Sequence, residues 1–172
     1  MERIKALVRD VPDFPVPGII FKDITPVLKD PEALGTIIEE FRKKYASLKI
    51  DAIVGIESRG FIIGTPLALA LKVPFVPIRK VGKLPFDKIS VSYKLEYGEA
   101  TIEMHTDALE KGDRVIIVDD LLATGGTTAA SIVLVEKLGA EVLRCAFVIE
   151  LGFLNGRKVL PEGKVDSLIV YD

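Results

Sequence analysis

The sequence predicts an α/β fold with a mostly parallel central sheet flanked by helices. Short apolar segments typical of strands alternate with longer segments typical of helices, which indicates strands joined by helical crossovers. The segments AIVGI, PFVPI and RVIIV are almost continuously apolar, as strands covered on both faces are. A chain of 172 residues fits one domain spanning residues 1–172.

Composition excludes several classes of function. The formal net charge is −2 and the pI is about 5.6, so no overall basic field favours nucleic acid. Cys145 is the only cysteine, which rules out an intrachain disulfide and favours the reducing cytoplasm. We expect neither a signal peptide nor a membrane span. Gln is absent and Asn155 is the only Asn, a scarcity typical of heat-adapted proteins.

The first third of the chain is expected to be helical around an irregular loop. Residues 2–9 fit a short helix. Residues 11–26 contain four prolines, so we expect a rigid loop without regular structure. Asp30, followed by Pro31 and Glu32, is a typical helix start. That helix should run to about Tyr45, with an apolar face made of Leu34, Ile37, Ile38 and Phe41.

The rest of the chain alternates strands and helices. Residues 80–99 mix Lys, Gly and Pro with alternating polar and apolar residues, and fit a β-hairpin or a long mobile excursion. Gly139 is expected to end a helix. The remaining predicted elements are strands 52–56, 74–78, 101–104, 114–120, 141–150 and 167–172, and helices 60–71 and 127–138.

The segment VIIVDDLLATGGTT (115–128) carries the clearest chemical signal. Gly125 and Gly126 lack β-carbons, and a helix starting near Thr127 adds backbone N–H groups and a positive dipole end. Together with the threonine hydroxyls, these groups make a site suited to a phosphate monoester. Asp119 and Asp120, at what we expect to be a solvent-facing strand end, suit hydroxyls or a metal ion further along the same ligand. A sugar phosphate has both parts.

Other interpretations of this segment are simpler or belong to other classes. A charged strand end followed by an ordinary glycine turn needs no ligand. A Walker-B strand would need a GxxxxGK[ST] loop, and a dinucleotide site would need GxGxxG after the first strand; the sequence has neither. A receiver domain would place its acidic pair near the N-terminus, whereas here more than a hundred residues precede it.

The segment resembles the phosphoribosyl-pyrophosphate (PRPP) signature of the type I phosphoribosyltransferases. The resemblance covers nearly the whole chain and implies the fold of that family, with an N-terminal base-binding hood at about residues 1–30 and a flexible β-hairpin lid at about residues 80–99. Members that act on adenine share, in this order and at about this spacing, the segments FPVPGIIFKDITPVL, GIESRGFIIG, IRKVGKLP, SYKLEYG and DDLLATGGT.

The resemblance also implies the reaction and its partners. Adenine and PRPP would give AMP and pyrophosphate in purine salvage, with Mg²⁺ as the cofactor and a homodimer as the assembly. The Mg²⁺ ion would bridge pyrophosphate and ribose oxygens without direct protein ligands. Relatives that use hypoxanthine, guanine or xanthine, and regulators that sense PRPP without catalysis, are the alternatives. The retained LEYG and RKVGKLP segments favour an enzyme.

The resemblance assigns roles to particular residues. Asp119 and Asp120 would hold the ribose hydroxyls and stabilise positive charge on the ribose. The 5′-phosphate would be bound by Ala123, Thr124, Gly125, Gly126 and Thr127. Pyrophosphate would be bound by Arg59, Arg79, Lys80, Lys83 and Tyr97. From position alone, the basic residues could equally be solvated surface groups.

The remaining roles concern adenine. Phe21 would stack on the base opposite Leu121, while the backbone of Ile20 and Lys22 reads its polar edge. Glu96 would lie near N7 and assist proton transfer. From position alone, Phe21 could be a core aromatic and Glu96 a solvated charge. His105 and Cys145 are expected to be structural, and we expect strained backbone, for example a cis non-proline peptide, within residues 56–60.

Overall fold

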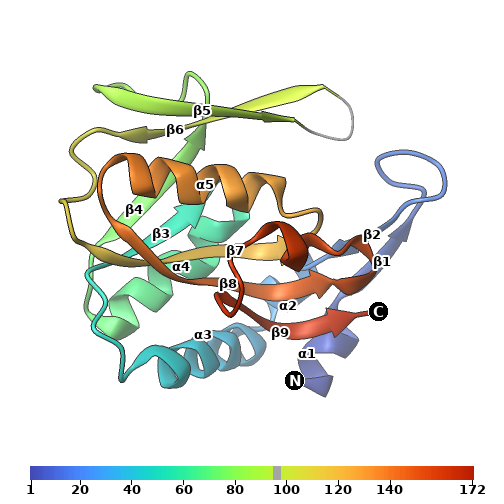
Figure 1. The fold of residues 1–172 in the computed structure, drawn as a ribbon. Coiled ribbons are helices and arrows are strands. Elements are labelled where there is room, and N and C mark those ends of the chain that lie inside the picture. The colour runs from blue at the N-terminus through green and yellow to red at the C-terminus, as the bar shows by residue number, and fades with distance from the viewer. Residues whose placement is uncertain (95–97) are drawn as a thin grey trace.

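A seven-stranded sheet forms the centre of the molecule in the computed structural model, which describes residues 1–94 and 98–172 (Figure 1). Its strand order is β5-β6-β4-β3-β7-β8-β9. Five strands run parallel: β4 (Phe75–Lys80), β3 (Ala52–Ile56), β7 (Arg114–Leu122), β8 (Glu141–Leu151) and β9 (Val165–Tyr171). The predicted α/β fold with a mostly parallel sheet is therefore confirmed.

Helices cover both faces of this sheet, and each face has its own core. Helices α3 (Pro31–Tyr45) and α4 (Arg59–Leu71) pack on one face, where Phe41 and Leu67 meet Ile116 and Val118 of β7. Helix α5 (Gly126–Lys137) covers the other face, where its buried side chains meet alternate residues of the same strand (Figure 1). Because β7 is covered on both sides, its nearly continuous apolar sequence is explained.

Local sequence signals set the ends of the main helices. The Asp30 side chain accepts hydrogen bonds from the backbone N–H groups of Glu32 and Ala33, so α3 begins where its N-cap predicted. Gly139 follows α5 with φ of +81° and donates its N–H to the carbonyl of Glu136. The short first helix, α1, spans Glu2–Leu7. None of the helices in the described ranges is long and apolar enough to cross a membrane.

The proline-rich segment is more regular than predicted, so the expectation of an irregular loop over residues 11–26 was wrong. Strands β1 (Arg9–Pro12) and β2 (Ile20–Asp23) form an antiparallel pair, followed by helix α2 (Thr25–Lys29). Pro15 and Pro17 lie in the connecting loop, where no ladder hydrogen bond is needed, and Pro26 stands in the first turn of α2, where prolines are tolerated. The pair projects beyond the carboxyl ends of β7, β8 and β9 (Figure 1).

The segment around residues 80–99 contains half of a hairpin. Strands β5 (Lys88–Lys94) and β6 (Glu99–His105) pair along their whole length, from Lys88 opposite His105 to Lys94 opposite Glu99. The hairpin joins the main sheet through antiparallel pairing of β6 with the end of β4. A hairpin is therefore present, but the predicted range of residues 80–99 was only partly right: it contains the first strand, whereas the second strand is β6, which includes the predicted strand at residues 101–104.

Candidate active site

A cleft lies at the carboxyl edge of the sheet, where three strands end. Its volume is about 220 Å³, and it is lined by Glu57, Ser58, Arg59, Lys80 and Asp119. Glu57, Ser58 and Arg59 follow β3, Lys80 is the last residue of β4, and Asp119 lies near the end of β7. The fold thus brings together the GIESRG, IRKVGKLP and DDLLATGGT segments, which are far apart in the sequence. Ligand sites of open parallel sheets lie at this edge.

The paired aspartates face different surroundings. Asp119 lines the cleft, whereas Asp120 is 2% exposed and accepts a hydrogen bond from Nε of Arg59. The expectation that both are solvent-facing is therefore wrong for Asp120. Strand β7 continues past both residues to Leu122, so Asp120 lies within the strand, and its carboxylate is turned to Arg59.

Burial and neighbouring charges shift the pKa values of Asp119 and Arg59. Burial raises the pKa of Asp119 well above its usual range, and the negative charge of Asp120 raises it further. Burial alone would lower the pKa of Arg59, but the charge of Asp120 and its hydrogen bond outweigh that effect and raise it. The site therefore holds a fixed cation beside a carboxyl group that is costly to ionise.

Helix α4 approaches β7 closely enough to require glycine at its start. A β-carbon added to Gly60 would lie 2.5 Å from the carbonyl oxygen of Val118 and 3.3 Å from Oδ1 of Asp119. Residues 57 and 58 just before it are joined by a cis peptide bond, which confirms the expected cis non-proline peptide within residues 56–60. The close approach places Arg59, at the first position of α4, against Asp120.

Glu57 is a site residue that the sequence did not reveal. Its carboxylate accepts two hydrogen bonds from the guanidinium of Arg79, both 3.2 Å long, and one of 2.8 Å from the backbone N–H of Lys80. The hydrogen bond from Arg79 is the main reason that the pKa of Glu57 is lowered. Lys80 and Lys83 are exposed. Nothing in the sequence linked Glu57 to a residue 22 positions away.

The glycine-rich loop has the predicted form. Gly125 has φ of +84° and precedes the first residue of α5, Gly126, so the loop leads directly into a helix N-terminus. Thr124 is exposed, and Oγ1 of Thr127 lies 3.0 Å from the hydroxyl of Tyr93 on β5. Tyr93 is a second residue that sequence reasoning missed, because its contact joins the hairpin to a segment 34 positions away.

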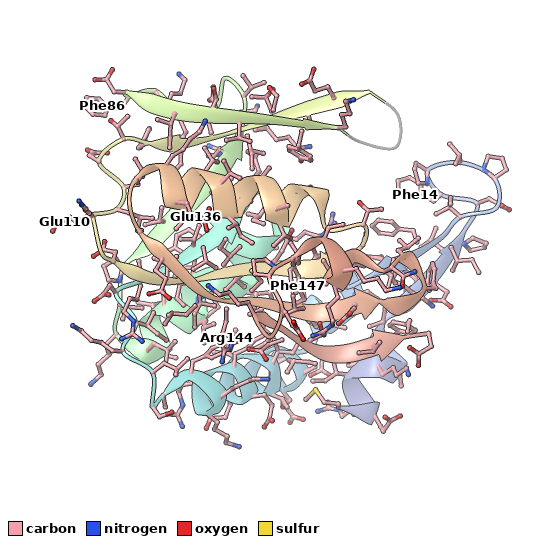
Figure 2. All side chains as sticks on the ribbon, viewed as in Figure 1. Phe14, Phe86, Glu110, Glu136, Arg144 and Phe147 are labelled. Carbon is pink, nitrogen blue, oxygen red and sulfur yellow. The ribbon has the colours of Figure 1, made fainter. Side chains whose placement is uncertain are left out.

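An aromatic side chain of the N-terminal segment, Phe21 on β2, lies near the cleft. The Phe21 ring centroid lies 5.8 Å from Cζ of Arg59 and 5.3 Å from the ring of Phe14, which it meets edge to face. Phe14 stands on the projecting loop between β1 and β2 (Figure 2). Phe21 is partly buried but belongs to neither core, so the core-aromatic interpretation is wrong. Ile20 is exposed.

The other predicted residues are placed as follows. The Nζ of Lys22 contacts Asp10 at 2.6 Å and lies 4.2 Å above the Tyr171 ring, and neither of these partners lines the cleft. Leu121 is partly buried against the core under α3 and α4. Cys145 is fully buried, and burial raises its pKa to about 12, as expected of a structural thiol. Glu96 and Tyr97 lie outside the described residues.

Comparison with known proteins places this chain in a class of enzymes. Residues 25–168 match the model of the family described as the phosphoribosyl transferase domain. An adenine phosphoribosyltransferase of Acetivibrio thermocellus is 59% identical over 98% of this chain and 99% of its own. A crystal structure of the enzyme from Thermoanaerobacter pseudethanolicus has a TM-score of 0.96 and 53% identity, with 99% of each chain covered.

A structure from Saccharomyces cerevisiae, solved with adenine and an imino-altritol bisphosphate, has a TM-score of 0.92 and 44% identity, with 97% of each chain covered. This protein is an enzyme of the glycosyltransferase type. It belongs to the adenine phosphoribosyltransferase family.

Proposed function

We propose that this chain transfers the 5-phosphoribosyl group of PRPP to adenine, which gives AMP and pyrophosphate in purine salvage. The observation that carries the proposal is the convergence of three parts at one edge of the sheet: the glycine loop of α5, the aspartates of β7, and Arg59 beside Phe21. Similar proteins were solved with matching ligands, namely adenine in yeast, and AMP, pyrophosphate and ribose-5-phosphate in Trypanosoma brucei at 30% identity.

The sugar phosphate occupies the loop and the aspartates. Residues 123–127 bind the 5′-phosphate through backbone N–H groups and threonine hydroxyls at the start of α5. Asp119, which faces the cleft, holds the ribose hydroxyls. Asp120 acts on the same ribose and also holds Arg59 in place. As the bond to pyrophosphate breaks, the ribose gains positive charge, which these carboxylates stabilise.

Pyrophosphate lies in the cleft among basic groups. Arg59 and Lys80 line it, and Arg79, Lys83 and Tyr97 complete the set that we assign to this product. Glu57 accepts hydrogen bonds from Nε and Nη2 of Arg79, and the remaining N–H groups of the guanidinium can donate to pyrophosphate oxygens. Bidentate binding of this kind suits a guanidinium and a phosphate.

Mg²⁺ fits the cleft as an ion carried by the substrate. Among the described residues, no group of three His, Cys, Asp or Glu side chains is placed to cage a metal. The cleft combines two carboxyl groups, Glu57 and Asp119, with two cations, Arg59 and Lys80, and Mg²⁺ is commonly bound through one or two carboxylates plus substrate phosphates. Oxygens of PRPP would therefore hold the ion near Asp119. When bound, Mg²⁺ supplies positive charge that stabilises the departing pyrophosphate.

Adenine is bound between the hood and the end of β7. Phe21 stacks on the base opposite Leu121, and the backbone of Ile20 and Lys22 reads its edge. The N9 atom of adenine attacks C1′ of the ribose, the C1′–O bond breaks, and its electron pair leaves with pyrophosphate. Glu96 near N7 assists the loss of the base proton. The Lys22 side chain is held by Asp10, which supports recognition through the backbone alone.

A direct assay tests the proposal. The purified protein is incubated with PRPP, Mg²⁺ and, separately, adenine, hypoxanthine, guanine or xanthine, and both nucleotide and pyrophosphate are followed. We expect AMP and pyrophosphate in equal amounts with adenine, and little product with the other bases. Preference for another base would show that the proposed substrate, adenine, is wrong. PRPP binding without turnover would identify a sensor instead of an enzyme.

We also propose a cytoplasmic homodimer. Helix α4 exposes Leu69 and Ile62, which are 76% and 42% exposed, and apolar side chains of this kind support an interface. Light scattering coupled to size-exclusion chromatography measures the mass directly. We expect twice the chain mass of 18.8 kDa, and a mass of one chain would exclude the homodimer.

A further inference from the structure

The glycine loop is supported from outside the sheet by a short 3₁₀ helix, η2 (Gly156–Val159), which the sequence analysis did not single out. Figure 1 shows this segment beside the end of β7 and the start of α5. A β-carbon on Gly156 would overlap the carbonyl oxygen of Ala123 and lie 3.0 Å from the backbone nitrogen of Gly125. The backbones of η2 and the loop are therefore in direct contact.

The contact is equally close from the other side. A β-carbon on Gly125 would lie 2.5 Å from Cγ2 of Val159 and 2.6 Å from the carbonyl oxygen of Gly156. A shift of η2 by a fraction of an ångström would thus move Ala123 or Gly125. Packed protein interiors transmit such shifts, because few voids exist to absorb them.

One ion pair attaches η2 to the sheet. Arg157 donates from Nε to Oε1 of Glu150 at 2.9 Å and from Nη2 to Oε2 at 2.5 Å, while Nη1 donates to the carbonyl of Val165 at 2.8 Å. The carboxylate also accepts a 2.6 Å hydrogen bond from the hydroxyl of Ser167. Glu150 is 6% exposed, and the hydrogen bond from Arg157 is the main reason that its pKa is lowered.

Glu150 lies in the sheet beside the start of the glycine loop, so this ion pair can influence the position of the loop. Glu150 on β8 pairs with Leu122, the last residue of β7 and the one directly before the loop. The carboxylate therefore fixes η2 to the same point from which the loop departs. A four-residue 3₁₀ helix has little stability of its own, so its position depends on such tertiary contacts.

We propose that Glu150 and Arg157 are positioning residues for binding of the 5′-phosphate, acting through Gly156 on the backbone of residues 123–125. The proposal rests on the proposed function, in which that backbone binds the phosphate of PRPP and AMP. Neither side chain touches the ligand. Their effect is to keep the N–H groups of the loop in the arrangement that a phosphate requires.

Three variants test the proposal. Arg157→Met keeps the aliphatic part of the side chain and removes the guanidinium, Glu150→Gln removes the charge of its partner, and Gly156→Ala leaves the ion pair intact but forces a methyl group against Ala123. Each should raise the KM for PRPP and the Kd for AMP by about tenfold to a hundredfold, the range expected for sub-ångström misplacement in a site. Arg157→Lys should recover part of the loss.

The matched control is Arg42→Met. Arg42 forms a similar two-point pair with Glu39, 2.6 and 2.8 Å long, on α3 and away from the loop. This variant should leave the KM for PRPP and the Kd for AMP unchanged. In every variant, the Kd for adenine and the kcat at saturating PRPP should stay within about threefold of wild type, since these do not depend on the 5′-phosphate contacts.

The outcomes separate this proposal from the proposed function. Inactivity of the wild-type protein with PRPP and adenine would overturn the function itself. Wild-type activity with an unchanged KM for PRPP in folded Arg157→Met and Gly156→Ala would overturn only the positioning role. A parallel loss of adenine affinity, kcat and thermal stability in both variants would also overturn it, because a merely structural role predicts that pattern. If Arg157→Met does not fold, Glu150→Gln and Arg157→Lys decide, because both alter the ion pair itself.

Discussion

The guanidinium of Arg59, at the start of α4, donates to the carboxylate of Asp120, near the end of β7. The two residues are 61 positions apart, and the carboxylate is almost entirely buried while half of the arginine side chain remains exposed. The pair therefore joins two parts of the proposed site, and either partner is expected to affect both stability and activity.

The first prediction concerns this pair. Arg59→Met leaves a buried carboxylate without its charged donor, so we expect the free energy of unfolding to fall by about 1–3 kcal/mol. Asp120→Asn should cost less, because the exposed side of Arg59 can still be hydrated. In the double variant, which carries both Arg59→Met and Asp120→Asn, the free energy of unfolding should fall by less than the sum of the two single losses. Urea denaturation of the four proteins measures this, and simple additivity would contradict an energetic coupling.

The second prediction concerns Tyr93. Tyr93→Phe removes the hydroxyl that lies 3.0 Å from Oγ1 of Thr127, and Thr127 belongs to the proposed phosphate loop. Loss of one neutral hydrogen bond corresponds to about 0.5–1.5 kcal/mol, so we expect the KM for PRPP to rise by about two- to tenfold. The kcat should change less. Steady-state kinetics with varied PRPP measures both constants.

Tyr45→Phe is the matched control for Tyr93→Phe. The Tyr45 hydroxyl donates to Asp166 at 2.9 Å on the face of the sheet under α3, away from the glycine loop. Its removal should lower thermal stability and leave the KM for PRPP unchanged. Equal kinetic effects in the two variants would show that Tyr93 acts through general stability and not through Thr127.

The third prediction concerns pH. Burial, followed by the charge of Asp120, raises the pKa of Asp119 in the folded protein above its value in the unfolded chain. The folded state then binds more protons than the unfolded state between these two pKa values, so stability falls as pH rises through that interval. Below about pH 4, the ordinary pKa of an aspartate, both states are protonated and the penalty disappears.

Asp119→Asn should therefore stabilise the protein while impairing catalysis. We expect the melting temperature of the variant to exceed that of wild type at pH 7, and the difference to vanish on acidification toward pH 4. Asp107→Asn, at an exposed position, controls for the change in net charge. A variant that is less stable than wild type at pH 7 would show that the Asp119 carboxylate supports the fold. Stabilisation on loss of a functional group is a familiar trade-off.

Local signals in the sequence predicted most of the fold. Asp30 and Pro31 mark the start of α3, and the apolar runs of β3 and β7 identify strands covered on both sides. These features depend on neighbours within a few residues. The pairing of β1 with β2 was missed because the prolines of the segment dominated its composition, although Pro12 is the last residue of β1, and Pro15 and Pro17 lie in the connecting loop, where no ladder bond is needed.

The site was predictable only in part, for a physical reason. The glycine loop and the basic segments have residue types suited to anions, whatever their neighbours are. The partners of these residues are set by tertiary contact: Glu57 with Arg79, Tyr93 with Thr127, and Gly156 with Ala123. The burial of Asp120 likewise depends on how far β7 continues, which the aspartate pair does not indicate.

The last prediction concerns the close approach of α4 to β7. Gly60→Ala places a methyl carbon 2.5 Å from the carbonyl oxygen of Val118, so the start of α4 must move away from the strand. Overpacking of this kind costs about 1–3 kcal/mol. Because Arg59 is the neighbouring residue and contacts Asp120, we also expect a large loss of kcat/KM for PRPP.

Gly35→Ala is the matched control, since Gly35 lies within α3 and an added β-carbon there meets no atom within 4 Å. Alanine is favoured over glycine in a helix interior by about 0.5–1 kcal/mol, so this control should be slightly more stable than wild type and fully active. Thermal denaturation and PRPP kinetics of the two variants measure both effects. Equal stability of Gly60→Ala and Gly35→Ala would show that α4 can shift without cost, and would remove the proposed reason for glycine beside Arg59.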